Sequence, residues 1–267
     1  MRIAIELAGD SDSTDDRLIE QLESDPRLRF GILAGANVPL FCGRQPVNTV
    51  RQAIAQLGRR NCLSLLWLLT LSDFQQAWPD LHEGARQKLW RHSLLTGVLA
   101  HYLLHTAGFN RFGDGLSAGM AHDIGHLLLV SPGARLGVVW HEEHDQFVER
   151  HISPEPQLDH CRLGASLLAF WEAPAAMIAS ALHHHDPAAA DERHRPLVVA
   201  VRLADLLAEH IDLDRPVRPL NLETTSAWQE LAAMEPWHTV QHLQHLAIER
   251  LPESLLMSEH LANMFGQ

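Results

Sequence analysis

The 267-residue chain has few cysteines and no run of basic residues, and both scarcities exclude classes of protein. Its three cysteines, Cys42, Cys62 and Cys161, form no Cys-x-x-Cys pair, which is typical of reduced thiols in a cytosolic protein. A formal charge of −12 without clustered Lys and Arg argues against direct DNA or RNA binding, because phosphate neutralisation needs a basic surface. We therefore expect a cytoplasmic protein that does not contact nucleic acid directly.

Long apolar segments and phosphate-binding loops are also missing. The most apolar stretch, residues 62–71, is far shorter than the roughly 20 residues that a helix needs to cross a bilayer. The N-terminal segment turns acidic within its first ten residues, too early for a signal peptide. The glycine-containing segment 113–115 is too short for a phosphate-binding loop and lacks its lysine. We expect no membrane segment.

Hydrophobic residues recur with helical period along most of the chain, which predicts an all-α fold. The alternation of Ile3, Ile5 and Leu7 is compatible with one short N-terminal strand. The valine run 198–201 also resembles a strand, but the leucines at 203, 206 and 207 continue the 3.6-residue period and favour a helix. The helices that we expect span 46–58, 63–74, 79–108, 116–130, 134–150, 158–171, 174–184 and 197–211.

The tail after Asp212 differs in composition from the rest of the chain. Pro216, Pro219 and the polar segment 223–226 indicate a linker. Two helices are expected after it, at 227–250 with a break near Pro236 and at 253–265. The sequence thus predicts a domain over 1–211, with an N-terminal helical lobe at about 14–78 and a helical core at about 79–211, and a C-terminal helical extension over 212–267.

Histidine is unusually frequent, with 19 dispersed through the chain, several of them in apolar helical segments. Seven residues of ligand type have spacings that suit a buried two-metal centre: His92, His122, Asp123, His160, His184, His185 and Asp205. A carboxylate can bridge two cations while imidazoles fill the remaining positions. Adjacent residues on a helix point about 100° apart, so each adjacent pair needs a centre surrounded by several helices.

A structural interpretation of each isolated histidine stays open on chemistry alone. A lone histidine in an apolar helix is more often a hydrogen-bonded core residue than a ligand. Cys161 directly follows His160 and would be able to add a thiolate, but we interpret it as a small buried core residue. The histidines 238, 242 and 245 fall on one helix face, which we interpret as a polar stripe. We interpret residues 140–145 as the solvated side of the helix predicted at 134–150.

Several ordered segments resemble the HDOD domain, the HD-related output domain of bacterial signalling proteins. In the core they are Trp-Arg-His-Ser (90–93), Ala-Gly-Met-Ala-His-Asp-Ile-Gly (118–125), Asp-His-Cys-Arg-Leu-Gly-Ala (159–165), Trp-Glu-Ala-Pro (171–174), Ala-Leu-His-His-His-Asp-Pro (181–187) and Leu-Ala-Asp (203–205). Segments 25–26, 33–37 and 53–58 are similar to the N-terminal lobe of that family. The resemblance covers roughly residues 18–211, and the ordered set is more specific than any one motif.

The resemblance implies an HD-like helical core with an N-terminal helical lobe packed on it. It also implies kinship with HD phosphohydrolases and HD-GYP cyclic-di-GMP phosphodiesterases, in which the positions that match the seven residues above bind metals. The expected cofactor is then a binuclear divalent centre of Fe, Mn or Zn, with Asp123 and His126 as the catalytic candidates. His126 stands where catalytic relatives often have a lysine, whose charge is fixed, whereas a histidine near neutral pH is only partly charged.

Two departures weaken the case for cyclic-di-GMP cleavage: the histidine at 126 in place of a lysine, and the absence of the HD-GYP loop. Those enzymes follow the paired histidines with an acidic residue and an Asp-Gly-x-Gly-Tyr-Pro loop, whereas this chain has Asp-Pro-Ala-Ala-Ala at 186–190. HDOD domains are usually regarded as regulatory or output modules. No receiver, sensor or cyclase module is recognisable, so an input signal is expected from a separate partner.

Three functions remain open at this point. The first is a regulatory signalling protein that contacts a protein partner through its N-terminal lobe or its acidic tail. The second is a metal-dependent phosphohydrolase acting on a nucleotide, a cyclic dinucleotide or another phosphoester. In that hypothesis one cation is held by His92, His122, Asp123 and Asp205, the other by His160, His184 and His185, and Asp123 bridges them. The third is a metal-free interaction scaffold.

Overall fold

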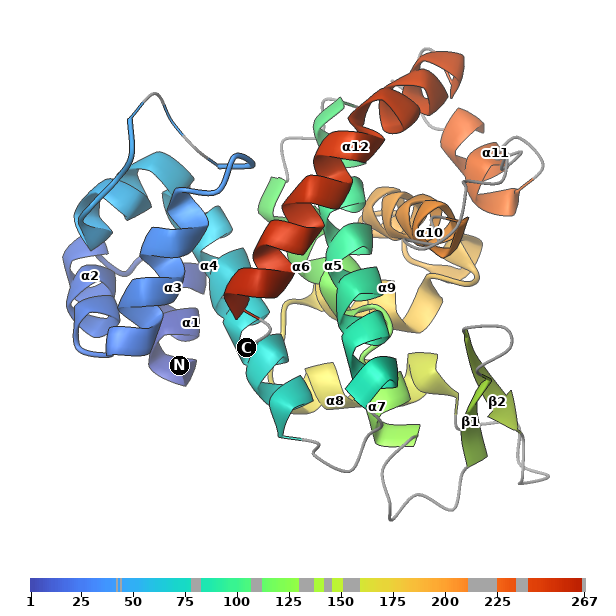
Figure 1. Cartoon of the computed structure of the whole chain (residues 1–267), viewed down its shortest axis with the longest axis horizontal. Helices are drawn as coiled ribbons and strands as arrows, with labels where there is room; N and C mark the ends of the chain where they lie inside the picture. The colour runs from blue at the N-terminus through green and yellow to red at the C-terminus, as the bar shows by residue number, and fades with distance from the viewer. Residues whose placement is uncertain are drawn as a thin grey trace.

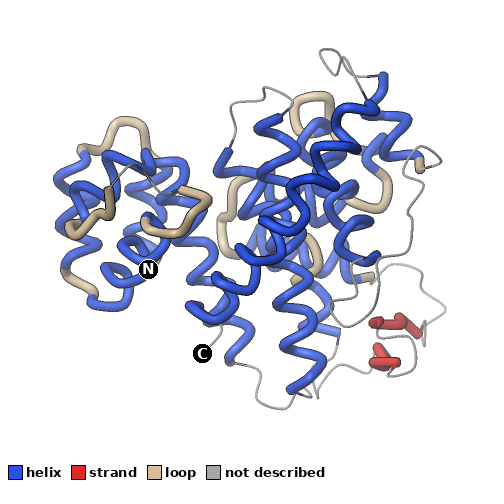
Figure 2. Tube along the Cα trace, turned by 45° about the horizontal axis from the view of Figure 1, so that its top comes forward, coloured by secondary structure: helices blue, strands red, loops and turns tan. Residues whose placement is uncertain are grey.

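The computed structural model describes residues 1–41, 43, 45–77, 83–106, 112–129, 137–141, 146–150, 159–210, 225–233 and 240–265. Within these ranges nearly all regular structure is helical, which confirms the all-α prediction (Figures 1 and 2). An N-terminal group of helices stands to one side of a larger helical core, and α4 (Val50–Gln76) runs between them (Figure 1). The boundaries predicted for the domains stay predictions.

The N-terminal lobe is built from α1 (Arg2–Gly9), α2 (Asp15–Glu23), α3 (Pro26–Ala36) and the first part of α4. The short strand with which the N-terminal sequence is compatible does not form. Its residues form α1, whose buried positions Ala4, Leu7 and Ala8 follow the i, i+3, i+4 spacing of a helix face. The alternation of Ile3, Ile5 and Leu7 is too short to outweigh this helical pattern.

Helix α4 begins at Val50, four residues after the predicted start. Thr49 caps it, because its hydroxyl accepts from the Gln52 amide at 3.2 Å and the Gln52 side chain accepts from the Thr49 amide at 3.2 Å. Gly58 interrupts the helix with φ 69° and ψ 164°, where the predicted segment stops. The helix then resumes and is buried nearly all round, which confirms the central helix predicted at 63–74.

The core is arranged around α5 (Glu83–Thr106), which packs against α6, α10 and α12. The valine run 198–201 lies inside α10 and is buried, so the choice of a helix over a strand there is confirmed. The elements that surround α5 directly or complete the core are α6 (Phe112–Ala121), α7 (Gly125–Leu129), α8 (His160–Phe170), α9 (Ala175–His183), the 3-10 turn η1 (Pro187–Ala189) and α10 (Arg195–His210).

Two predicted helices of the core are corrected. The helix predicted at 116–130 is broken by a turn at 122–124, between α6 and α7. The helix predicted at 134–150 is wrong, because residues 137–141 (β1, Gly137–His141) and 146–150 (β2, Gln146–Arg150) form an antiparallel hairpin with Val139 opposite Val148. Valine and aromatic residues are concentrated in both strands, and they favour strands over helices. Residues 142–145, part of the predicted solvated face, lie outside the described residues.

The C-terminal extension contains α11 (Ser226–Ala233) and α12 (Val240–Phe265). The predicted end of one helix at 250 and start of another at 253 is wrong, because α12 continues through Pro252. Helix α12 lies along α5 (Figure 1), and the Ser72 hydroxyl on α4 donates to the Phe265 carbonyl at its end. Several predicted features of the tail lie outside the described residues: the break near Pro236, most of the linker, His238, and the side chains of His242 and His245.

None of the described helices combines the length and the apolar character that crossing a bilayer requires.

Glycines allow the backbones of neighbouring core helices to touch. A Cβ atom added to Gly119 on α6 would lie 2.7 Å from the Gly97 Cα on α5. A Cβ added to Gly125 on α7 would lie 1.9 Å from the carbonyl oxygen of His160 on α8. Since backbone atoms cannot yield as flexible side chains do, any larger residue at these positions forces the helices apart.

We predict that Gly119→Ala destabilises the protein by about 1–3 kcal/mol, the usual cost of an overpacked core. The matched control is Gly9→Ala, whose new Cβ would meet only a Leu63 methyl at 3.9 Å, an ordinary contact. Urea unfolding followed by circular dichroism measures both variants. Equal stability of Gly119→Ala and Gly9→Ala would contradict the proposed close contact of α5 and α6.

Candidate metal centre

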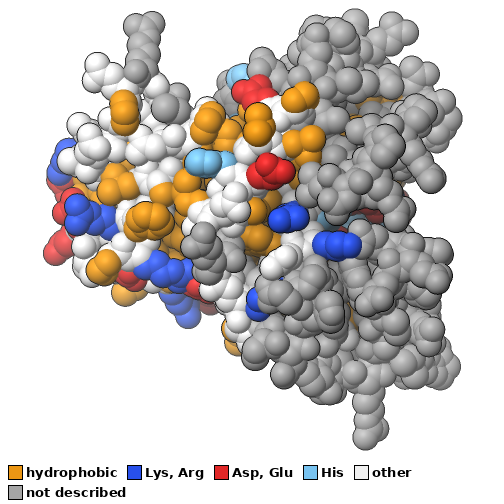
Figure 3. Space-filling model, viewed as in Figure 1, with side chains coloured by type: hydrophobic (Ala, Val, Ile, Leu, Met, Phe, Trp, Pro, Cys, Tyr) orange, Lys and Arg blue, Asp and Glu red, His pale blue; other side chains and the backbone are white. Residues whose placement is uncertain are grey.

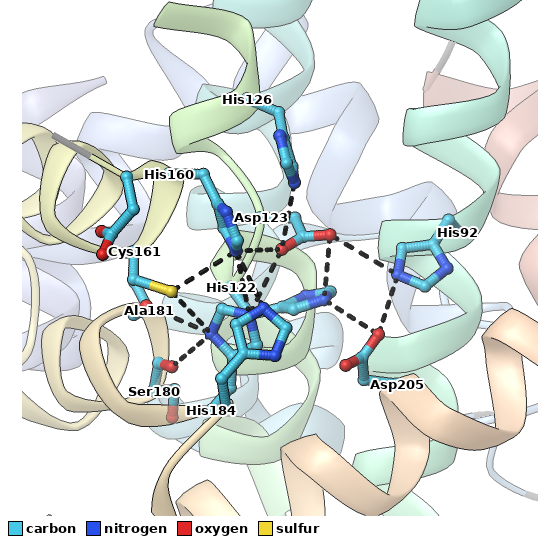
Figure 4. A network of polar contacts seen from close by, with 12 residues as sticks. His92, His122, Asp123, His126, His160, Cys161, Ser180, Ala181, His184 and Asp205 are labelled. Carbon is cyan, nitrogen blue, oxygen red and sulfur yellow. Dashed lines mark hydrogen bonds and ion pairs between the residues drawn. The ribbon is translucent and has the colours of Figure 1, made fainter. Parts of the chain in front are cut away.

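The structure brings all the sequence-predicted site residues together at one place in the core (Figure 4). They come from different elements: His92 from α5, His122 and Asp123 from the turn after α6, His126 from α7, His160 from the start of α8, His184 and His185 from the end of α9, and Asp205 from α10. The site is therefore an interhelical centre, as the spacing predicts.

The turn at 122–124 explains how adjacent residues reach one centre. Backbone hydrogen bonds from Ile124 to Ala121 at 3.2 Å and from His126 to Asp123 at 3.0 Å close the turn in place of regular helical bonds. The two side chains are thus freed from the 100° separation that a helix imposes. His184 caps α9 and His185 follows in a turn, so the second adjacent pair also lies at a helix end.

Asp123 lies in the middle of the centre and presents one carboxylate oxygen to each side (Figure 4). Its Oδ2 is 3.4 Å from His122 Nε2 and 3.7 Å from His92 Nε2. Its Oδ1 is 3.4 Å from both His160 Nε2 and His184 Nε2. The carboxylate therefore divides the centre into two groups of donor atoms.

The first subsite consists of His92, His122, Asp205 and the Oδ2 atom of Asp123. Asp205 Oδ1 is 3.2 Å from His92 Nε2 and 3.5 Å from His122 Nε2, while its Oδ2 accepts from the Arg202 guanidinium. His122 is fully buried, and its Nε2 makes no hydrogen bond of ordinary geometry. Its Nδ1 lies 2.6 Å from the Gly119 carbonyl, which can only accept, so Nδ1 is the donor there and Nε2 is the nitrogen that faces the subsite.

The second subsite consists of His160, His184, His185 and the Oδ1 atom of Asp123. His160 Nε2 is 3.3 Å from His184 Nε2 and 3.1 Å from His185 Nε2. Three imidazole nitrogens therefore converge on one place. His184 Nδ1 donates to the Ser180 or Ala181 carbonyl, at 3.2 and 3.1 Å, which directs Nε2 to the subsite. This arrangement of donor atoms fits a cation.

The two carboxylates are held ionised by their surroundings. Burial alone would raise the pKa of Asp123, but His122, His126 and His184 lower it well below its usual value. Burial likewise opposes ionisation of Asp205, but the nearby imidazoles of His122 and His92 lower its pKa well below the usual value. Two ionised carboxylates in one buried cluster require compensating positive charge.

The imidazoles of the second subsite differ in basicity. Burial would lower the pKa of His184, but its hydrogen bond with Asp123 outweighs this effect and raises the pKa to about 10. Burial, followed by the positive charge of His184, lowers the pKa of His185 to about 4. At neutral pH without a metal, His184 therefore holds a proton between its ring and Asp123, whereas His185 is neutral. A cation in this subsite would have to displace that proton.

His126 lies at the edge of the centre. Its Nε2 is 3.8 Å from Asp123 Oδ1, and its ring stacks on that of His160 with centroids 4.1 Å apart. The side chain is buried. The geometry places His126 near the site, and its catalytic role stays a prediction.

Sequence reasoning missed the position of Cys161. The residue is buried as predicted, but its sulfur lies 3.4 Å from His160 Nε2 and 4.0 Å from His184 Nδ1. His160 and Cys161 are the first two residues of α8, which Asp159 caps by accepting from the Arg162 amide at 2.8 Å. Its position next to His160 in the first turn of a helix is the feature of the sequence that would have indicated a possible ligand.

The family model of the HDOD domain matches residues 1–187, and the chain belongs to the HDOD family. This confirms the resemblance drawn from the sequence.

Solved structures share the fold over almost the whole chain. A candidate phosphohydrolase from Shewanella amazonensis SB2B superposes with a TM-score of 0.71 at 19% identity, covering 98% of this chain and 92% of its own. An HDOD domain protein of unknown function from Geobacter sulfurreducens gives a TM-score of 0.69 at 19% identity, covering 97% and 90%. At these identities the comparisons establish the fold alone.

An uncharacterised protein of Treponema pallidum (strain Nichols) is 22% identical to the chain over 234 residues. The match covers 85% of this chain and 44% of that relative, so the chain spans less than half of the relative's length.

The raised pKa of His184 predicts how the metal-free protein responds to alkaline pH. The folded state binds this proton more tightly than the unfolded state. The contribution of the protonated His184 to the free energy of unfolding is therefore fully present below about pH 6.5 and is lost as pH rises through about 10. In excess chelator, the free energy of unfolding of the wild-type protein should fall by at least about 1 kcal/mol more than that of His184→Gln between pH 6.5 and 10. A pKa shift of one unit corresponds to about 1.4 kcal/mol.

Urea unfolding at several pH values measures this difference. His183→Gln, which changes the preceding residue at the end of α9, is the control, and its unfolding free energy should depend on pH as that of the wild type does. Parallel curves for the wild type and His184→Gln would contradict the assigned His184–Asp123 ion pair.

Proposed function

We propose that this chain is a cytoplasmic signalling HDOD protein whose core binds two divalent cations bridged by Asp123. The observation that carries the proposal is the division of the Asp123 carboxylate, with one oxygen facing His92 and His122 and the other facing His160 and His184. Bridging by a shared carboxylate is the usual arrangement where two cations lie close together.

The spacing of the donor atoms supports this proposal. Ligands bound at about 2.0–2.2 Å around a tetrahedral cation lie roughly 3.3–3.6 Å from one another. The donor pairs of the first subsite are 3.2–3.7 Å apart, and those of the second are 3.1–3.4 Å apart. The unbonded, fully buried Nε2 of His122 also fits a cation there. The donors are oxygen and imidazole nitrogen, which suit Fe, Mn or Zn.

The residues of the chain have distinct tasks in such a centre. Gly119, Ser180 and Ala181 fix the ligand tautomers of His122 and His184 through their carbonyl groups. Arg202 is a cation and does not bind the metal. Its guanidinium binds Asp205 Oδ2 and so orients Asp205 Oδ1 towards the first subsite. When bound, two cations would supply Lewis acidity towards a phosphate group.

A regulatory role is supported by the segment that follows His185. Residues 187–189 form the short 3-10 turn η1, which packs on α10, at the place where HD-GYP enzymes carry a longer glycine-rich loop. The Asp186–Ala190 segment contains no glycine or tyrosine to build such a loop. We therefore favour a sensing or structural role for the centre over cyclic-di-GMP cleavage.

Contact with a protein partner is supported by exposed apolar residues. Ile3 on α1, Phe30 on α3 and Phe170 at the end of α8 are 56%, 62% and 83% exposed. Figure 3 shows hydrophobic side chains over the N-terminal lobe, with charged side chains of both signs near its edge. A mixed surface of this kind suits a protein partner in a signalling pathway.

The test is metal content, measured by elemental mass spectrometry on untagged protein purified without chelator. We predict close to two equivalents of Fe, Mn or Zn for the wild type and loss of both in Asp123→Asn, because a neutral amide cannot bridge two cations. Asp12→Asn, in the exposed loop between α1 and α2, is the charge-matched control and should keep both. Circular dichroism establishes that the variants are folded.

A metal-free wild type with a stable fold would contradict the proposal and favour an interaction scaffold. In that case the buried cluster would be a network of protonated imidazoles and carboxylates.

Phosphoester hydrolysis is the second candidate function, and it is supported by the short distances between the side chains of the seven residues predicted as ligands. Its substrate would be a nucleotide, a cyclic dinucleotide or another phosphoester. We predict that the metal-loaded wild type gains thermal stability on loading but releases no phosphate or nucleotide product from a panel of such compounds. Turnover that Asp123→Asn abolishes would replace the regulatory assignment with the enzymatic one.

A further inference from the structure

We propose that Cys161 is a ligand of the second subsite, which then binds a thiolate-preferring cation such as Zn(II) through sulfur and the imidazoles of His160, His184 and His185. The inference rests on the proposed metal-binding function and assigns the class of cation that this half of the centre prefers. It also gives a role to a residue that the sequence analysis interprets as simple core.

Cys161 lies among the donors of the second subsite. Its sulfur is 3.4 Å from His160 Nε2, the same nitrogen that faces His184 and His185. The side chain is 8% exposed, and Figure 4 shows the sulfur directed towards the rings of His160 and His184. The potential ligand atoms of Cys161 and these three histidines all lie within 4.8 Å of one another.

The distances around His160 Nε2 have the scale of one coordination polyhedron. They are 3.1 Å to His185 Nε2, 3.3 Å to His184 Nε2 and 3.4 Å to Cys161 Sγ. Ligands of a tetrahedral Zn(II) bound at about 2.0–2.1 Å for nitrogen and about 2.3 Å for sulfur lie roughly 3.3–3.6 Å apart. Asp123 Oδ1, 3.4 Å from His160 Nε2, completes the set, and a five-coordinate cation near the middle of these atoms would meet all five donors with small side-chain adjustments.

The converging imidazole nitrogens provide an independent indication of a ligand. His160 Nε2 lies 3.1 Å from His185 Nε2 and 3.3 Å from His184 Nε2, so three imidazole nitrogens of ligand type converge on one place. Such convergence of imidazole nitrogens is the arrangement that a bound cation needs. The sulfur of Cys161 borders the same group of nitrogens.

The second described cysteine shows what a purely structural thiol looks like in this chain. Cys62 is fully buried in α4 within the hydrophobic core, and burial raises the pKa of its thiol to about 12. Cys161 differs because its sulfur contacts two imidazoles. Cys62 is thus a matched control of the same residue type, buried in the same protein.

The two subsites would differ in the cations they prefer. The first offers two carboxylate oxygens and two imidazoles, which accept Mn or Fe as readily as Zn. A thiolate in the second favours softer ions and disfavours Mn and Mg. We expect the centre to be chemically asymmetric, with Zn(II) or Co(II) taken up first by the second subsite.

The experiment titrates Co(II) into the full metal-free chain and records the near-ultraviolet absorption, since a Co(II)–thiolate bond gives a charge-transfer band that imidazole and carboxylate ligands do not. We predict this band for the wild type and for Cys62→Ala, and its loss in Cys161→Ala. Zn(II) affinity of Cys161→Ala, measured by competition with a chromophoric chelator, should fall about tenfold or more. Cys161→Ser, similar in size, checks that any loss is due to the missing sulfur rather than to packing.

Elemental mass spectrometry on the same samples separates the possible failures. Bound cobalt without a charge-transfer band, or a band that persists in Cys161→Ala, would overturn the thiolate assignment and leave the binuclear centre intact. No bound cobalt or zinc in the wild type would overturn the binuclear centre itself, and the ligand assignment with it.

Discussion

The carboxylate of Asp123, held among buried imidazoles, is the interaction on which the rest of the centre depends. An ionised carboxylate in a protein interior is costly unless positive charge compensates it. His122, His160 and His184 approach it at 3.4 Å from different elements, and Asp205 adds a second negative charge nearby. The pKa values respond as expected, with Asp123 lowered and His184 raised. Bound cations would replace shared protons as the compensating charge, so occupancy of the centre and stability of the core are coupled.

The fold supplies this geometry through close backbone contacts. Gly119 lets α6 touch α5, which brings His122 beside His92, and Gly125 lets α7 touch α8, which brings Asp123 beside His160. The glycines flank the ligands in sequence, so one short segment provides both the ligands and the space for them. Helix α12 packs along the outer length of α5, which links the C-terminal extension to the helix that carries His92.

The ligand candidates could be predicted from sequence because their residue types and order form a specific pattern, and the structure brings every one of them together. The turn that separates α6 from α7 could not, since the hydrophobic period runs through Leu116 to Val130 without interruption. The hairpin strands at 137–141 and 146–150 were missed because the segment after Pro132 was interpreted as a helix with residues 140–145 on its solvated side. Cys161 was undervalued because a small residue in a predicted helix is more often core packing, and sequence alone does not show that its sulfur lies 3.4 Å from His160 Nε2.

The most direct test of the central claim is a crystal structure of the metal-loaded protein with anomalous diffraction measured at the absorption edge of the bound metal. The account predicts two anomalous peaks roughly 3.5–4 Å apart, each within bonding distance of a different oxygen of Asp123. For Zn(II), the stronger of the two peaks would lie in the second subsite, next to Cys161. A single peak, or peaks away from Asp123, would contradict the bridged centre.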